Sequence, residues 1–206
     1  MQLVDFESAK NILSDYNIPL AKVFLATSKK DVLAGAKKIG YPIFLKVYGK
    51  NILHRTDLGG VSQAGNAKEA EKIFSKMMKI KEAEGVLVQK KILGKELIIG
   101  VKQDEQFGPV ILVGLGGIFA EAMNDIVLRI APVTEKEALK MFSELKGYAY
   151  LRGIRDNKPV DLGKISKIIS SLSEFSLKNT QIKEIDLNPV IASEKEAVVV
   201  DFKFLI

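Results

Sequence analysis

The single histidine of the chain, His54, lies in a loop that carries the residue types needed for nucleophilic chemistry at phosphorus. A neutral imidazole is a good nucleophile, because its ordinary pKa leaves it largely unprotonated at neutral pH. Asp57 could orient one ring nitrogen, Arg55 could hold phosphoryl oxygens, and Gly59-Gly60 would allow close backbone approach or loop motion. The same residues also fit a surface histidine in a turn, so both interpretations stay open.

A second candidate is Lys46, which closes an apolar segment, residues 43–47, with the pattern of a buried strand. An ammonium is costly to bury unless it meets an anion, so Lys46 could contact a phosphate. The alternative is a lysine whose stem lies along the strand while its ammonium reaches water.

A third candidate is a pair of polar positions near the C-terminus. Alternation along an expected strand places Asp186 and Asn188 on one face, and Asp201 lies on a second expected strand. If the two strands form a hairpin around Glu194-Lys195, Asn188 lies opposite Asp201. Two hard oxygen ligands that face each other suit Mg²⁺, which takes the rest of its ligands from water and nucleotide phosphates. The solvent face of an ordinary hairpin gives the same pattern.

Glycines follow another apolar strand, at Gly114, Gly116 and Gly117. No Gly-Lys-Ser/Thr sequence follows them, so they do not form a P-loop, and a tight turn is expected. A lysine-rich stretch, residues 90–95, has the composition of a solvated surface from which one lysine could meet a nucleotide.

These candidates need an α/β (or α+β) framework to position them. Helices are predicted after the capping residues Asp5, Ser28, Asn66, Thr134 and about Asp161. Strands are predicted at residues 43–47, 86–89, 96–101, 110–113, 126–130, 182–190 and 197–204. This order indicates two lobes that divide near residues 88–95.

Composition excludes several classes of protein. The chain has 206 residues, of which 47% are hydrophobic, and it has no cysteine, which excludes disulfides, thiolate metal sites and a cysteine nucleophile. The net charge of +6 comes mostly from lysine, whereas nucleic-acid binders rely on arginine, so no nucleic-acid partner is expected. The sequence shows no signal peptide and no apolar run of about 20 residues, so we expect a cytoplasmic protein without a membrane partner.

The motifs occur in an order that resembles one family, the β subunit of ADP-forming acetyl-CoA (acyl-CoA) synthetase, an ATP-grasp protein. The segments that carry the resemblance are residues 7–13, 16–19, 40–46, 52–61, 96–101, 107–109, 114–118 with Glu121, 161–162, 184–189 and 200–201. The resemblance implies an ATP-grasp fold of two lobes with the nucleotide between them. Residues 1–89 would form the N-terminal lobe with a phosphohistidine loop, and residues 90–206 the C-terminal lobe with the Mg²⁺ and nucleotide site.

The resemblance also implies roles for single residues. His54 would be the catalytic residue that carries a phosphoryl group. The implied nucleotide-binding residues are Lys46, Val88, Gln89, Lys90 and Glu96. Among these, Lys46 would contact phosphates, Glu96 the ribose hydroxyls and the segment 88–90 the adenine. The implied Mg²⁺ ligands are Asn188 and Asp201, in agreement with the hairpin pattern.

The activity implied is phosphoryl transfer to ADP within the reaction acyl-CoA + ADP + phosphate = acid + CoA + ATP. A CoA-binding α subunit would complete the enzyme as an α2β2 hetero-oligomer. Two alternatives stay open. One is a succinyl-CoA-synthetase-type or other ATP-grasp carboxylate ligase subunit, and the other is a non-enzymatic regulatory module that binds Mg-ATP.

Overall fold

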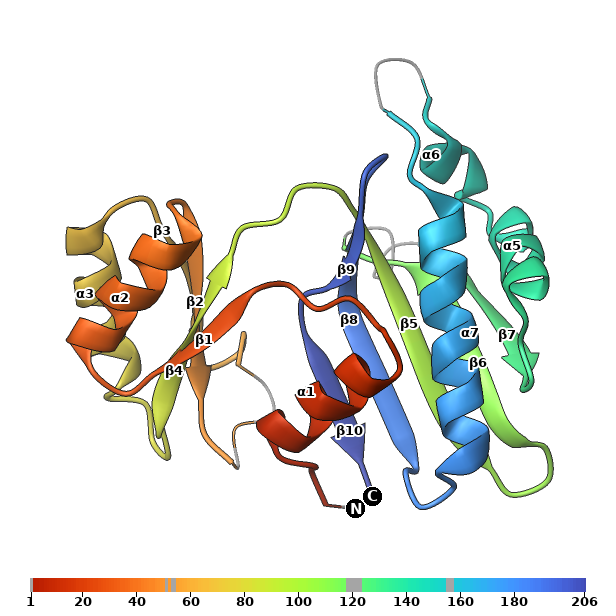
Figure 1. Cartoon of the computed structure of the whole chain (residues 1–206), viewed down its shortest axis with the longest axis horizontal. Coiled ribbons are helices and arrows are strands. Elements are labelled where there is room, and N and C mark those ends of the chain that lie inside the picture. Colours follow the sequence, from red (N-terminus) through yellow and green to blue (C-terminus); the bar gives the residue numbers. More distant parts are fainter. Residues whose placement is uncertain (1, 51, 53–54, 118–123, 155–157) are drawn as a thin grey trace. The chain divides into compact units, whose positions relative to one another are not determined.

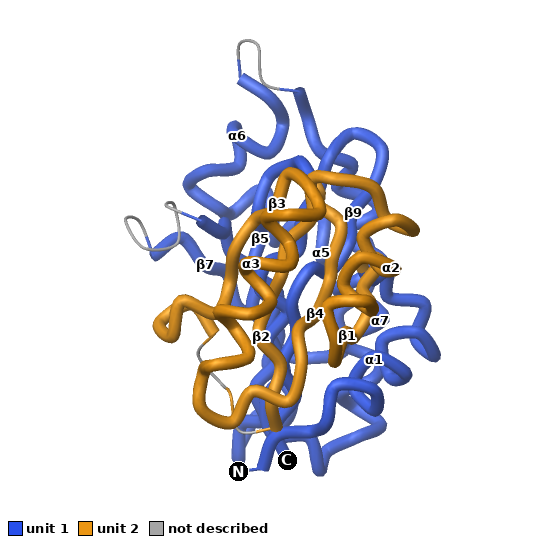
Figure 2. Tube along the Cα trace, turned by 90° about the vertical axis from the view of Figure 1, so that its left-hand side faces the viewer, with its two compact units in different colours: residues 1–20, 93–206 blue, residues 21–92 orange. Residues whose placement is uncertain are grey.

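The chain forms two compact units. The computed structural model describes residues 2–50, 52, 55–117, 124–154 and 158–206. Unit 2 is formed by residues 21–92, and unit 1 is formed by residues 1–20 together with residues 93–206 (Figure 2). Both units combine helices with antiparallel strands, which confirms the predicted mixed α/β class. No helix of the described ranges has the length and apolar character needed to cross a membrane.

Unit 2 is a four-stranded sheet covered on one face by two helices (Figure 1). The strand order is β1-β4-β2-β3, and each pair is antiparallel. The elements are β1 (Val23–Ala26), α2 (Lys29–Ile39), β2 (Ile43–Tyr48), β3 (Val61–Ala64), α3 (Ala67–Met77) and β4 (Gly85–Lys90). The predicted caps are confirmed: Ser28 Oγ accepts from the amide of Asp31 at 3.2 Å, and Asn66 Oδ1 from that of Glu69 at 3.0 Å.

Unit 1 is a six-stranded antiparallel sheet in the order β10-β8-β5-β6-β7, with β9 paired to β8. Its strands are β5 (Lys95–Asp104), β6 (Gly108–Leu115), β7 (Ile126–Ile130), β8 (Glu184–Ala192), β9 (Ala197–Val199) and β10 (Phe202–Leu205). Its helices are α1 (Phe6–Asp15), α5 (Glu135–Glu144), α6 (Tyr148–Arg152) and α7 (Leu162–Lys178). Helices α5 and α7 cover one face, where Leu97, Ile99 and Leu187 pack into the core (Figure 1).

The N-terminal segment belongs to unit 1, whereas the sequence placed residues 1–89 together in one lobe. Val4 donates its amide to the carbonyl of Phe204 at 2.9 Å, and the rings of Phe6 and Phe202 stack with centroids 5.2 Å apart. The apolar face of α1, including Leu13, completes the core of unit 1. The correction arises because the two ends of the chain pair with each other, a contact that local sequence patterns do not reveal.

The predicted strand at residues 197–204 is divided into β9 and β10. The break lies opposite Asn188-Pro189 of β8, and proline has no amide hydrogen for the ladder. The carbonyl of Pro189 still accepts from the amide of Val200 at 2.9 Å. The two strands therefore keep one register on both sides of the break.

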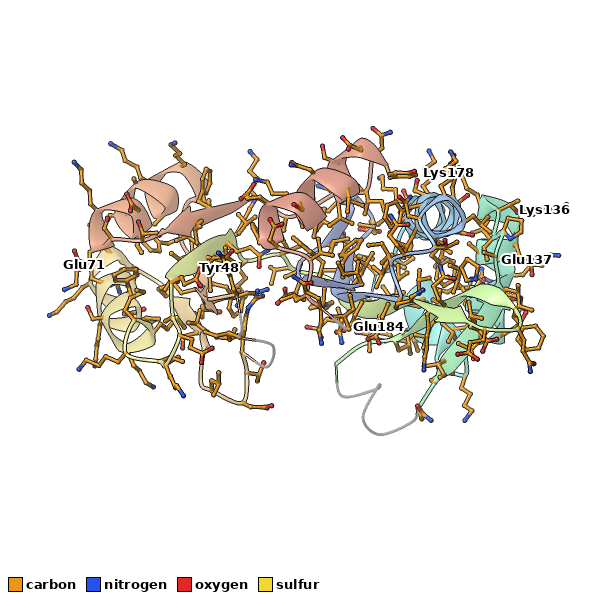
Figure 3. The ribbon with its side chains drawn as sticks, turned by 90° about the horizontal axis from the view of Figure 1, so that it is seen from below. Tyr48, Glu71, Lys136, Glu137, Lys178 and Glu184 are labelled. Atoms are coloured by element: carbon orange, nitrogen blue, oxygen red, sulfur yellow. The ribbon has the colours of Figure 1, made fainter. Side chains whose placement is uncertain are left out.

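Arg129 on β7 links the sheet to α5, of which the exposed Lys136 and the partly buried Glu137 are labelled in Figure 3. Arg129 Nε lies 3.1 Å from Glu137 Oε1, and a second ion pair joins Arg129 to Glu144. We expect Arg129→Met to lower the melting temperature by roughly 2–4 °C at pH 7, because both ion pairs are lost together. Circular dichroism measures this change, and Lys136→Met, which removes an exposed lysine of the same helix, is the control.

The loss of stability in Arg129→Met should become smaller as the pH falls. The hydrogen bond from Arg129 lowers the pKa of Glu137 below its usual value, so the interaction contributes fully above the unfolded pKa of Glu137. Its contribution disappears as the pH falls through the lowered pKa. A loss in Arg129→Met that stayed the same at pH 2.5 and pH 7 would contradict the ion-pair explanation.

Candidate functional site

Lys46 is buried in the sheet of unit 2, with only 6% of its surface exposed. It lies on β2 opposite Leu87 of β4 and Val61 of β3. Its neighbours Leu45 and Val47 pack into the core beneath α2 and α3, so the alternation places Lys46 on the opposite face of the sheet. Burial of a charged side chain is costly unless its charge is compensated.

The loop that contains His54 returns to the same strand. His54 itself lies outside the described residues. At the end of the loop, Gly60 accepts from the amide of Val47 at 2.7 Å and donates to the carbonyl of Arg55 at 2.8 Å. A Cβ on Gly60 would lie 2.3 Å from Val47 Cγ1, so the main chain approaches β2 too closely here for a residue with a side chain. The loop therefore ends beside the strand position that follows Lys46.

The three predicted adenine-contacting residues lie at the end of β4 and differ in what they expose. Gln89 lies opposite Phe44 of β2, so it shares the face that carries Lys46. Val88 is fully buried and packs into the core of unit 2, so only its main chain could touch a ligand. Lys90 is exposed.

In unit 1, Asn188 and Asp201 lie opposite each other, in the predicted register. Leu187 pairs with Phe202 on one side, and Val190 pairs with Val199 on the other. The amide of Asn188 donates to the carbonyl of Asp201 at 3.1 Å. Because Leu187 packs into the core, alternation places the side chains of Asn188 and Asp201 on the sheet face away from α5 and α7.

Acidic side chains surround this pair. Asp186 shares the face of Asn188, and burial raises the pKa of its carboxyl, with Glu184 and Asp201 acting in the same direction and Lys203 opposing them. Within the described ranges, no three His, Cys, Asp or Glu side chains form a group able to hold a metal. One amide oxygen and one carboxylate in a negative environment fit a hard cation such as Mg²⁺, which takes most of its ligands from water and phosphates.

Glu96 lies on β5, the strand next to β8, and on the same face as Asn188. Its neighbour Leu97 is fully buried in the core, whereas Glu96 is exposed. The amide of Gly116, at the end of β6, donates to the carbonyl of Glu96 at 2.8 Å. Unit 1 therefore gathers three of the predicted site residues, Glu96, Asn188 and Asp201, on one face of its sheet.

An apolar hollow of about 700 Å³ lies on this face, and Asp186 is one of the residues that line it. Its lining includes Leu112 and three side chains of β7, Ile126, Leu128 and Ile130, which are 43–52% exposed. Strand β7 thus turns apolar residues away from the helices. A continuous exposed apolar surface of this kind is typical of a face that a ligand or another protein covers.

The sequence did not assign a role to Asp186 or to the glycines that face Glu96. The signal for Asp186 was the alternation along residues 184–188, which already placed it beside Asn188. No local pattern pairs Gly116 with Glu96, because twenty residues separate them in the chain.

Comparison with known proteins relates the chain to one family. A family model described as an ATP-grasp domain matches residues 2–206. The subunit beta of acetate–CoA ligase [ADP-forming] I from Pyrococcus furiosus is 37% identical over 207 residues, which cover 96% of this chain and 89% of that subunit.

Other relatives are longer. Acetate–CoA ligase [ADP-forming] I of Archaeoglobus fulgidus is 39% identical over 203 residues, which cover 95% of this chain but 30% of that protein. The chain therefore spans less than a third of such a relative, and nearly all of the Pyrococcus subunit.

A solved structure matches both units. Acetyl-coenzyme A synthetase 1 of Ca. Korarchaeum cryptofilum, in complex with coenzyme A and Ca-AMPCP, has a TM-score of 0.93 and 35% identity, covering 100% of this chain and 93% of that chain. A second structure of that protein, with a TM-score of 0.86 and 32% identity over the same shares, holds Mg-AMPPCP and has its phosphohistidine segment pointing towards the nucleotide binding site.

Proposed function

The chain belongs to the ATP-grasp family, and we propose that it is the nucleotide-binding β subunit of an ADP-forming acyl-CoA synthetase. The overall reaction would convert acyl-CoA, ADP and phosphate to a carboxylic acid, CoA and ATP. The observation that carries the proposal is the Asn188–Asp201 pair on an acidic sheet face, in a chain that matches a β subunit over nearly the full length of both.

The described residues would bind the nucleotide through complementary charges. The ammonium of Lys46 would neutralise phosphate oxygens, and Glu96 would accept hydrogen bonds from the ribose hydroxyls. Gln89 and Lys90, with the main chain of Val88, would line the adenine. Asn188 and Asp201 would hold Mg²⁺, which neutralises charge on the phosphates of ADP or ATP.

His54 would carry the phosphoryl group between two sites. One imidazole nitrogen attacks the phosphorus of an acyl phosphate, a P–N bond forms, and the P–O bond to the carboxylate breaks. A terminal oxygen of ADP then attacks the same phosphorus, the P–N bond breaks and ATP forms. Charge neutralisation and in-line positioning are the main contributions that a protein makes to such a transfer.

The name subunit beta, given to the Pyrococcus relative, implies a partner chain for that protein. We propose that the partner here is a CoA-binding α subunit in an α2β2 assembly, which supplies the acyl phosphate. The assembly would work in the cytoplasm, where ADP, ATP and CoA are available.

Labelled ATP tests the proposal directly. The purified chain is incubated with Mg²⁺ and [γ-³²P]ATP, alone and with the CoA-binding subunit, and the labelled residue is identified by mass spectrometry. We expect an acid-labile, base-stable phosphate on His54, and ATP formation from acetyl-CoA, ADP and phosphate once the partner is present.

Two other outcomes would contradict the proposal. Turnover without label on His54 would indicate a carboxylate ligase that passes an acyl phosphate directly. Mg-ATP binding without label or turnover in the presence of the partner would indicate a regulatory module.

A further inference from the structure

The turn at the end of β6 approaches Glu96 more closely than any residue with a side chain would allow. A Cβ on Gly116 would lie 2.9 Å from Glu96 Cβ and 3.0 Å from its carbonyl carbon. The hydrogen bond from the amide of Gly116 to the carbonyl of Glu96, 2.8 Å long, fixes this approach. Gly116 therefore sets the distance between the main chains of the turn and of β5.

The next residue, Gly117, lies against the carboxylate of Glu96. A Cβ on Gly117 would lie 3.1 Å from Glu96 Oε2 and 3.8 Å from Cδ. Gly117 also has a φ of +62°, which favours glycine. The carboxylate of Glu96 thus occupies space beside the turn that a side chain at position 117 would take.

The two glycines differ in what a methyl group would displace. At Gly116 it would meet the main chain of Glu96, so the strands themselves would have to move. At Gly117 it would meet the far end of a flexible side chain, which can turn away at little cost. A methyl group at Gly117 would therefore displace the carboxylate of Glu96 and not the strand, in addition to the backbone strain that the positive φ imposes.

We propose that Gly117 is a positioning residue that directs Glu96 toward the ribose of the nucleotide, and that the Gly117–Glu96 contact sets the preference for ribonucleotides over 2′-deoxyribonucleotides. This inference rests on the proposed function, in which Glu96 accepts hydrogen bonds from the ribose hydroxyls. Such bonds weaken steeply when the acceptor leaves the line of the donor, so the direction of the carboxylate decides their strength.

Substitution of Gly117 tests the inference through a ratio of affinities. Isothermal titration with Mg²⁺ present measures the Kd of ADP and of 2′-deoxy-ADP for the full chain. We expect Gly117→Ala to weaken ADP binding by about tenfold, the effect of one charge-assisted hydrogen bond, and 2′-deoxy-ADP binding much less. The preference for ADP would then fall toward one. Gly117→Ala combined with Glu96→Ala should bind ADP no more weakly than Glu96→Ala alone, because both remove the same contact.

Gly108→Ala is the matched control. Gly108 begins β6, the strand that ends just before Gly117, and has a similar φ of +72°, but its Cβ would meet nothing within 4 Å. It imposes the same backbone strain without touching Glu96, so the ratio of the two Kd values should not change. Glu96→Asp, which draws the carboxylate back by one methylene and leaves the turn intact, is a second variant, and it should also reduce the preference for ADP.

The outcomes separate the inference from the function on which it rests. If Gly117→Ala and Glu96→Asp weaken ADP and 2′-deoxy-ADP equally, or if Gly117→Ala adds fully to Glu96→Ala, the positioning role is wrong while the nucleotide site stands. If the unaltered chain does not bind Mg-ADP, the proposed function fails and the inference fails with it.

Discussion

Replacing His54 by asparagine is expected to lower the rate of ATP formation from acetyl-CoA, ADP and phosphate by about a thousandfold or more. Asparagine keeps a polar side chain of similar size but has no nucleophilic ring nitrogen, so the phosphorylated intermediate cannot form. The rate is measured with the complete enzyme, in which the CoA-binding subunit is present. Labelling with [γ-³²P]ATP should fall to background in the same variant.

Binding of Mg-ADP separates loss of chemistry from loss of the site. The residues that we propose to hold the nucleotide lie on β2, β4, β5 and β8 and between β9 and β10, so His54→Asn should leave the Kd of Mg-ADP within about twofold. Lys50→Gln removes an exposed charge from the same loop and should retain the rate. A rate for His54→Asn within tenfold of the unaltered enzyme would remove His54 from the reaction.

The sequence specified the local structure of the site well, because local rules govern it. Capping side chains fix where α2 and α3 begin, and the capping residues Ser28 and Asn66 can be recognised in the sequence. Alternation along β8 and the position of its turn fix the register that places Asn188 opposite Asp201. The break at Pro189 does not follow from the alternation, because the proline interrupts the ladder while the register of β8 with β9 and β10 is kept. The short strands β1 and β3 are also absent from the sequence prediction.

The rest depends on contacts between distant parts of the chain. Helix α1 packs against β10, and Val88 is buried in the core of unit 2. Both facts depend on which helices and strands pack together, and the alternation of residues along one strand does not determine this. The contact between Gly117 and Glu96 is of the same kind, since a glycine motif predicts a turn but not the side chain beside it. Sequence therefore indicates which residues could do chemistry, whereas the contacts that hold them in place appear only in the fold.

Replacing Asp201 by asparagine is the most direct test of the metal site in the described part of the chain. Asn keeps an oxygen that can accept from the amide of Phe202, as Asp201 Oδ1 does at 3.0 Å, so the fold should be retained. It removes the one negative charge of the Asn188–Asp201 pair, and a neutral amide is a weaker ligand for Mg²⁺. We expect kcat/KM for ADP to fall by about a hundredfold, with partial recovery at high Mg²⁺.

Glu184→Gln distinguishes ligation from a general electrostatic effect. Glu184 is also acidic and pairs with Leu205 of β10, farther along β8 from Asn188. Its removal lowers the negative potential near Asp186 without altering a proposed ligand, so kcat/KM should change by no more than about threefold. Equal losses in Asp201→Asn and Glu184→Gln would mean that the face attracts cations only by its charge. A rise in the Mg²⁺ requirement confined to Asp201→Asn would mean that this carboxylate binds the metal. A general loss of negative charge would raise the requirement in Glu184→Gln as well.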